Sequence, residues 1–236
     1  MSKLIKELSV FFPAFNEEKN IEKTVKDAIA VLEEVTEKWE VIIIDDGSSD
    51  NTGKIADKLS ENEKRIKVVH HKPNKGYGGA LKSGYEASKY EWVAFADSDG
   101  QFDFSEIKTF IEKQKETKAD LVLGIRMERA DPFIRKVYTF VWSKLLPRIL
   151  LGLKVSDYSC GFKLIRSDVY KKVQPLVGEE KVTQIEMLTK AQRMGFVFAE
   201  VGVHHYPRKY GHQTGADLKV ISKSFIDLIK LWRELR

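Results

Sequence analysis

The sequence is poor in cysteine and has no long hydrophobic run. Its one cysteine, Cys160, cannot form an internal disulfide, which excludes a disulfide-stabilised fold and fits a reducing, cytosolic location. No apolar run approaches the roughly 20 residues that span a bilayer. Charges interrupt the first residues too early for a signal peptide. We therefore expect a protein that is soluble or attached to a membrane only at its surface.

Acidic residues are missing from one stretch of the chain. Between Asp131 and Asp157 there is no Asp or Glu, whereas five Lys or Arg side chains fall there. The tail from His204 onward carries seven Lys or Arg against three Asp or Glu. With a net charge of +5, this placement favours anionic partners such as a nucleotide, a lipid phosphate or a membrane surface. Nucleic acid is not expected, because the basic residues lie on apolar stretches and no nucleic-acid-binding motif is visible.

The spacing of apolar residues predicts an α/β fold in one domain. Short apolar runs in the first half alternate with stretches at helical spacing, which indicates a mostly parallel sheet flanked by helices. Asn16 is the expected cap of the first helix, and Asp103 begins a later one. The predicted strands of this half are Leu8–Phe12, Val41–Ile44, Ile66–Val69, Trp92–Ala96 and Leu121–Gly124.

The second half is less regular. Phe133–Leu151 is predicted to be a basic, apolar helix with a bend at Pro147. A helix is expected after the capping-box pair Thr183 and Glu186, and Gly195 should end it. Two strands and a basic, amphipathic C-terminal helix complete the prediction, at Phe162–Ile165, Phe196–Tyr206 and Leu218–Leu235.

Three of the predicted strands are followed by loops rich in carboxylate or amide groups, at 13–18, 45–48 and 97–101. Ligands of open α/β sheets lie beyond the carboxyl ends of the strands, so we expect the three loops to converge. Asp97 and Asp99 point the same way in an extended segment and suit Mg²⁺ or Mn²⁺ bound with phosphate oxygens. Gln101 could add a neutral oxygen. The alternative is a loop whose aspartates only form turns and cap a helix.

Four motifs resemble, in order and spacing, those of family-two glycosyltransferases of the GT-A fold. They are PAFNEE at 13–18, DDGSSD at 45–50, NKGYGGALKSG at 74–84 and ADSDGQ at 96–101. The resemblance implies a nucleotide-sugar-binding half at 1–126 and an acceptor-binding half with membrane-facing helices at 127–236. It implies that Asp97 and Asp99 handle the metal and the diphosphate. The donor-binding residues that it implies are Pro13, Ala14, Asn16, Glu17, Asp46, Gly76, Lys82, Asp97 and Ser98.

Shorter matches resemble the polyprenyl-phosphate hexose synthases, including the dolichyl-phosphate mannose synthases. Gln101 after the D-x-D pair matches their third metal ligand. The residues matching their acceptor-phosphate site are Arg126, Arg135, Thr139 and Arg208. Cys160 and Lys163 replace Ser and Arg in the segment 157–166, and His204 and His205 depart from the mannose-synthase pattern, which leaves the sugar open.

The preferred hypothesis is inverting transfer of a hexose from a GDP- or UDP-hexose to a polyprenyl phosphate. A phosphate acceptor is already largely ionised near pH 7, so no strong base is required. The protein would act peripherally on the cytoplasmic face of a membrane, and a separate membrane-anchoring subunit is left open. A second hypothesis, transfer to a hydroxyl, needs Asp157 or Glu186 as a base. A third is a non-catalytic nucleotide-sugar-binding or scaffold protein.

For several other residues the sequence allows two different roles. Glu186 could equally be half of the capping box, and Asp157 could orient the acceptor or the metal, or simply hold a loop. His204 and His205 could bind metal or diphosphate, but neighbours on a strand face opposite ways. Cys160 fits a small buried side chain better than a nucleophile. Trp142 and Trp232 lie on basic, apolar stretches and could contact a membrane or pack in the core.

Overall fold

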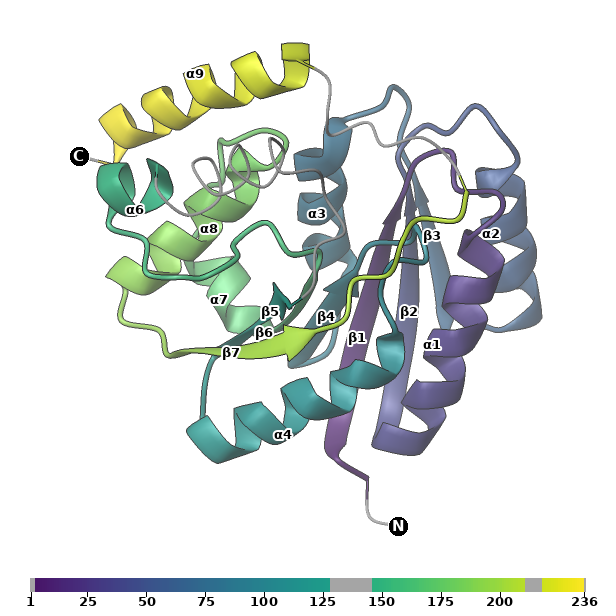
Figure 1. Ribbon diagram of the computed structural model, residues 1–236. Coiled ribbons are helices and arrows are strands. Elements are labelled where there is room, and N and C mark those ends of the chain that lie inside the picture. The colour runs from purple at the N-terminus through teal and green to yellow at the C-terminus, as the bar shows by residue number, and fades with distance from the viewer. Residues whose placement is uncertain (1–2, 128–145, 211–217, 236) are drawn as a thin grey trace.

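The computed structural model describes residues 3–127, 146–210 and 218–235. Seven strands form one sheet in the order β3-β2-β1-β4-β6-β5-β7 (Figure 1). Neighbouring strands are parallel, except that β6 runs antiparallel to both β4 and β5. The mostly parallel sheet is therefore confirmed. The strands are β1 (Ile5–Ala14), β2 (Thr36–Asp45), β3 (Ile66–His70), β4 (Trp92–Ala96), β5 (Leu121–Arg126), β6 (Phe162–Arg166) and β7 (Phe198–Val203).

Helices cover both faces of the sheet. The side chains of β1 alternate between two hydrophobic clusters: Val10 and Phe12 belong to the cluster under α1, α2 and α4, and Phe11 to the one under α3, α7 and α8. Every central strand is thus buried on both faces, which explains its uninterrupted apolar sequence. The helices are α1 (Ile21–Val35), α2 (Thr52–Asn62), α3 (Gly76–Ala87), α4 (Ile107–Thr117), α6 (Leu146–Leu151), α7 (Ser167–Lys172), α8 (Val182–Arg193) and α9 (Leu218–Glu234).

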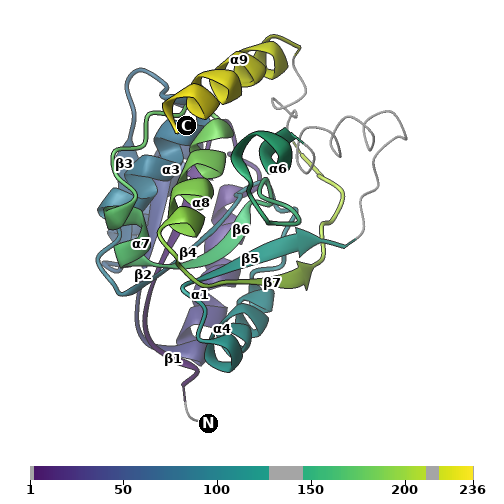
Figure 2. The ribbon, with the colours of Figure 1, turned by 90° about the vertical axis from the view of Figure 1, so that its left-hand side faces the viewer.

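The C-terminal helix α9 forms an outer layer. It lies across α8 and α6, on the side of the molecule away from α1 and α4 (Figure 2). Leu228 and Leu231 are buried in this contact, whereas Ile226 is exposed. No helix in the described part of the chain is long and apolar enough to cross a membrane.

Two predicted helix caps are wrong. Asn16 has a positive φ of 57° and lies before the helix, whose first turn follows Asn20. Thr183 does not cap α8, because its hydroxyl donates to Gly178 O instead, and the helix begins at Val182. In both places a nearby backbone group competes for the polar side chain. Asp103 does cap the 3₁₀ turn at Phe104–Glu106 that leads into α4, as its carboxylate accepts from Ser105 N–H.

Most of the predicted basic helix Phe133–Leu151 lies outside the described residues, and only its end is seen, as α6. The predicted strand Phe162–Ile165 is confirmed as β6, and the C-terminal segment contains the helix α9. Gly195, with a φ of +81°, follows the end of α8 as expected.

Candidate functional site

The loops after β1, β2 and β4 meet at the carboxyl end of the sheet. Asp46 N–H donates to Ala14 O at 2.9 Å, which joins the first two loops. Ser98 Oγ donates to Pro13 O at 2.6 Å and joins the third. These contacts are made by the parallel neighbours β1, β2 and β4, whose ends necessarily lie together. The predicted convergence of the three loops is confirmed.

Asp46 is held by residues that the sequence analysis did not single out. One carboxylate oxygen, Oδ1, lies 2.6 Å from His71 Nδ1 and 2.8 Å from the backbone N–H of Lys75. The other ring nitrogen of His71 lies 2.9 Å from Ser83 Oγ on α3. Both Asp46 and His71 are buried. The carboxylate is thus fixed through Oδ1, and among the described residues no hydrogen bond is made to its Oδ2.

Asn16 and Glu17 belong to the loop that follows β1. Asn16 Oδ1 accepts from Ser49 N–H at 2.8 Å. Glu17 is buried and pairs with Arg208, while Asn20 donates to its second oxygen at 2.7 Å. Burial raises the pKa of Glu17 despite these partners. The positive φ of Asn16 lets the chain turn here, since Asn tolerates the left-handed region.

Asp97 and Asp99 form a carboxylate pair at the end of β4. Burial, and then the charge of Asp99, raise the pKa of Asp97 to about 7. Burial also raises the pKa of Asp99, although Arg208 lies 3.5 Å from it and opposes the shift. A cation bound between these two half-buried carboxylates would offset the cost of ionising them.

Gln101 lies beside this pair but is partly engaged. Its backbone N–H donates to Asp99 Oδ1 at 3.1 Å, and its side-chain Nε2 donates to Tyr206 O at 2.8 Å. Its oxygen Oε1 remains a neutral ligand atom. Over the described ranges, no group of three or more His, Cys, Asp or Glu side chains could hold a metal ion. Any metal here would need ligand oxygens from a bound substrate in addition to the two carboxylates.

The two described arginines of the predicted phosphate site are both paired. Arg126 makes a double hydrogen bond to Asp157, with both distances at 2.8 Å, and also donates to Ser159. Arg208 bridges Glu17 and Asp99. Their positive charges oppose the raised pKa values of Asp97 and Asp99, respectively. The other two predicted phosphate ligands, Arg135 and Thr139, lie outside the described residues.

The remaining predicted residues lie on α3 and α8. Gly76 begins α3 with a φ of +74°, and a side chain there would overlap the carboxylate of Glu180. Lys82 is half-buried on the same helix. Glu186 on α8 is fully buried, and its two oxygens accept from Lys190 Nζ and Gly178 N–H, both at 2.6 Å.

The two adjacent histidines face different neighbours. His204 Nδ1 lies 2.6 Å from Glu106, and the ring of His205 packs against Phe102. Cys160 is buried, and burial raises the pKa of its thiol to about 11, so it stays protonated. The expectation of a small buried side chain therefore fits Cys160.

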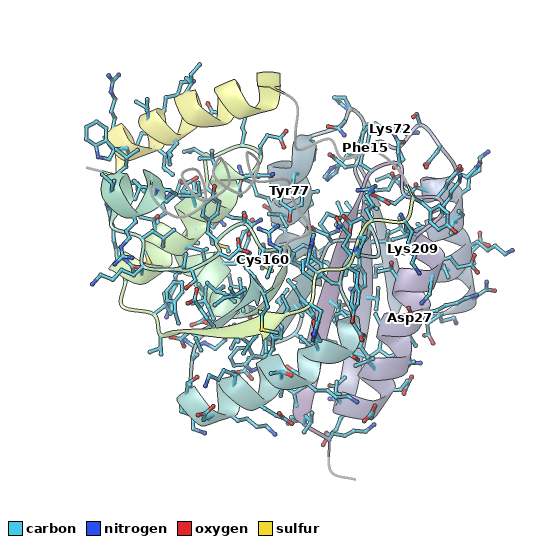
Figure 3. All side chains as sticks on the ribbon, in the orientation of Figure 1. Phe15, Asp27, Lys72, Tyr77, Cys160 and Lys209 are labelled. Carbon is cyan, nitrogen blue, oxygen red and sulfur yellow. The ribbon has the colours of Figure 1, made fainter. Side chains whose placement is uncertain are left out.

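Three further residues reach the carboxylate pair without having been predicted as site residues. Tyr77 on α3 donates its hydroxyl to Asp97 at 2.9 Å. Lys163 on β6 and Gln184 on α8 lie behind it. In Figure 3, Tyr77 and Cys160 lie near the middle of the view, apart from Asp27 on α1. Tyr77 lies within the NKGYGGALKSG motif, of which Gly76 and Lys82 were predicted to contact the donor but Tyr77 was not.

Comparisons with known proteins agree with this geometry. Residues 9–174 match the family described as glycosyl transferase family 2. The dodecaprenyl-phosphate galacturonate synthase of Rhizobium johnstonii is 30% identical over 210 residues, covering 87% of this chain and 60% of that protein. The dolichyl-phosphate beta-glucosyltransferase of Dictyostelium discoideum is 30% identical over 215 residues, covering 84% of this chain and 65% of that protein. The chain thus spans less than two thirds of either relative.

A solved structure shares the fold. The glucosyl-3-phosphoglycerate synthase of Mycobacterium tuberculosis, in complex with Mn²⁺, uridine diphosphate and glucosyl-3-phosphoglycerate, has a TM-score of 0.68 and 18% sequence identity. The match covers 98% of this chain and 80% of that chain. At this identity the likeness concerns the fold, which is the GT-A fold expected from the motifs.

Proposed function

Because this chain belongs to glycosyl transferase family 2, we propose that it is an inverting transferase that moves a hexose from a nucleotide diphosphate sugar to a polyprenyl phosphate. The observation that carries the proposal is the half-buried carboxylate pair Asp97 and Asp99 at the carboxyl end of the sheet, with the positive charges of Arg126 and Arg208 nearby. The two relatives named for dodecaprenyl phosphate and dolichyl phosphate support the lipid acceptor.

The donor would lie along the loops that the structure brings together. Asp46, held by His71 and Lys75, presents a carboxylate oxygen to an N–H of the nucleobase. The rest of the donor site would be formed by Pro13, Ala14, Asn16, Glu17 and Ser98, together with Gly76 and Lys82 on α3. The donor would be a UDP- or GDP-hexose.

The residues present fit a divalent ion. Asp97 and Asp99 are hard oxygen ligands, and desolvation raises the pKa of both, a cost that a bound cation would offset. They would hold Mg²⁺ or Mn²⁺, with Gln101 Oε1 as a further oxygen. When bound, such an ion supplies Lewis-acid stabilisation of the charge that develops on the departing diphosphate.

The acceptor phosphate would replace a carboxylate as the partner of Arg126 and of Arg208. Arg126 now binds Asp157, and Arg208 binds Glu17 and Asp99, so each guanidinium could turn one of its donors to a phosphate oxygen. Arg135 and Thr139 complete the proposed set. A phosphate monoester is its own nucleophile near pH 7, so the remaining task is in-line positioning, which inverts the sugar carbon.

Transfer to a hydroxyl is the alternative, and it would need a base. Both oxygens of Glu186 already accept hydrogen bonds, from Lys190 and Gly178. Both oxygens of Asp157 accept from Arg126. Because both oxygens of each carboxylate already accept hydrogen bonds, neither side chain is free to take a proton from a sugar hydroxyl, which favours the phosphate acceptor.

The proposal places the protein peripherally on the cytoplasmic face of a membrane, where a lipid phosphate is accessible. The basic composition of the second half supports this position. A separate anchoring subunit would be compatible with it.

Radiolabelled UDP-glucose and GDP-mannose, each incubated with polyprenyl phosphate or with soluble sugars, test the proposal. We expect label in the lipid fraction with one donor and Mn²⁺. Asp99→Ala should reduce this transfer by at least about 100-fold, because a bound metal supplies several kcal/mol. Circular dichroism checks that the variant is folded. Transfer only to soluble sugars would overturn the lipid acceptor, and full activity of Asp99→Ala would overturn the metal site.

A further inference from the structure

A series of hydrogen-bonded polar side chains ends on Asp97. Lys163 Nζ donates to Gln184 Oε1. Gln184 Nε2 lies 3.4 Å from the Tyr77 hydroxyl, and that hydroxyl lies 2.9 Å from Asp97 Oδ1. The four residues come from β6, α8, α3 and the end of β4, so they connect the two halves of the chain. Lys163 and Gln184 are both buried, with exposed fractions of 0% and 1%.

The direction of every bond in this chain is set by Lys163. An ammonium group has three donors and no acceptor. Gln184 must therefore turn its oxygen towards Lys163, which turns its NH₂ group towards Tyr77. The Tyr77 oxygen accepts from that NH₂ group, so its only proton points to Asp97. The reverse orientation of the amide would set N–H against an ammonium.

Asp97 is fixed from a second side as well. Its backbone N–H donates to Gly161 O at 3.0 Å, and its carboxylate packs directly on the Cα of Gly161. A side chain at Gly161 would overlap both carboxylate oxygens. The Tyr77 hydroxyl and the backbone of Gly161 together restrict the Asp97 carboxylate to one orientation.

Burying the Lys163 ammonium group in the protein core is energetically unfavourable. Within the described residues, no carboxylate lies within 4.0 Å of Lys163 Nζ, whose bonded partners are the neutral Cys160 O and Gln184. Burial lowers the pKa of Lys163 to about 8. An unpaired buried ion costs several kcal/mol, and an apolar residue would be the more stable choice. Lys163 does act on Asp97, because it sets the direction of the hydrogen bonds through Gln184 and Tyr77. This action explains why an ammonium group is buried here.

We propose that Tyr77 is a positioning residue whose hydroxyl, oriented by Lys163 through Gln184, holds Asp97 in the conformation that binds the divalent ion. This inference rests on the proposed function for the metal itself. It adds to that function the side chains that orient the metal ligand Asp97 without contacting the ion. Hydrogen bonds of this kind restrict a ligand's rotation and typically affect metal affinity 10- to 100-fold.

The first test compares two tyrosines of the same helix. Mn²⁺ binding in the presence of UDP is measured by electron paramagnetic resonance, without any turnover. Tyr77→Phe removes the hydroxyl and should weaken Mn²⁺ binding roughly 10-fold. Tyr85→Phe is the matched control, because Tyr85 is buried on α3 and its hydroxyl has no hydrogen-bond partner in the described structure. It should change Mn²⁺ affinity by less than about 2-fold.

The second test changes Gln184, which links Lys163 to Tyr77. Gln184→Glu keeps the side-chain shape and the bond from Lys163, but it cannot donate to Tyr77. If Asp97 is oriented as proposed, this variant should weaken Mn²⁺ binding by about as much as Tyr77→Phe. A purely electrostatic effect has the opposite sign, since an added negative charge near the ion tightens its binding.

The outcomes separate this inference from the proposed function. Equal Mn²⁺ affinity in wild type and Tyr77→Phe, with both folded by circular dichroism, overturns the role of Tyr77 and leaves the transferase in place. Unchanged or tighter binding by Gln184→Glu overturns the directional chain. Wild-type protein that binds no Mn²⁺ with UDP overturns the metal site, and the role of Tyr77 with it.

Discussion

Ionised Asp97 destabilises the metal-free protein, and this makes the free energy of unfolding depend on pH. Its pKa is about 7 in the folded state and 3.8 without the fold, so the folded state holds the proton over the intervening pH range. The stability associated with that proton is fully present below pH 4 and is lost as the pH rises through 7. A residue that is shaped for a ligand commonly weakens the free protein in this way.

The isosteric Asp97→Asn variant should therefore be more stable than wild type at pH 8 when no metal is present. The gain should be on the order of 1–2 kcal/mol and should disappear near pH 4, because Asn cannot ionise and still accepts from Tyr77. Urea denaturation at several pH values measures it. Asp27→Asn, at an exposed site on α1, is the control and should show no such pH dependence. An equal gain at pH 4 and pH 8 would contradict the assignment.

Gly161 provides a second test at the residue scale. A methyl group on this residue would overlap the Asp97 carboxylate, so Gly161→Ala must displace Asp97 or the strand. We expect a loss of about 1–3 kcal/mol in the free energy of unfolding and at least a 10-fold loss of Mn²⁺ binding with UDP. Calorimetry measures both. Unchanged metal binding would show that the orientation of Asp97 does not depend on this contact.

At the scale of elements, strands and loops were more predictable than the partners of single side chains. The predicted strand Trp92–Ala96 matches β4 at both ends, because a continuous apolar run buried on two faces is a local signal. The position of β6 between β4 and β5 depends on strand pairings between residues about 70 and about 40 positions apart in the chain, and no local pattern contains them. Lys163 and Gln184 were missed as site residues for this reason.

The junction of β3 and α2 depends on pH. His70 bridges Asp57 and Asp45 at 2.9 and 2.8 Å, and these hydrogen bonds raise its pKa above 6.5. The stability from this bridge is fully present below pH 6.5 and is lost as the pH rises through the folded pKa. His70→Gln should therefore cost more at pH 6 than at pH 9, by less than about 1 kcal/mol because the ring is partly exposed. Chemical denaturation at both pH values checks this, and a difference of the opposite sign would refute it.

At the scale of the whole molecule, the net charge of +5 and its concentration in the second half predict attraction to anionic membranes. The protein should sediment with vesicles containing phosphatidylglycerol and not with neutral phosphatidylcholine vesicles. Each basic residue near the surface contributes about 1 kcal/mol at moderate salt, so binding should fall strongly at about 0.5 M NaCl. Salt-independent binding would point to hydrophobic insertion, and no binding would contradict a peripheral position.

The antiparallel strand β6 also bears on how this protein can be divided. It fills the gap between β4 and β5, and it brings Gly161 and Lys163 to the aspartates that end β4. A fragment that stops at residue 126 would leave β4 with an open edge, which favours aggregation. The regions expected to bind donor and acceptor are therefore not interchangeable cassettes, and a chimera joined at residue 126 would have to inherit β6 from the same parent as β4.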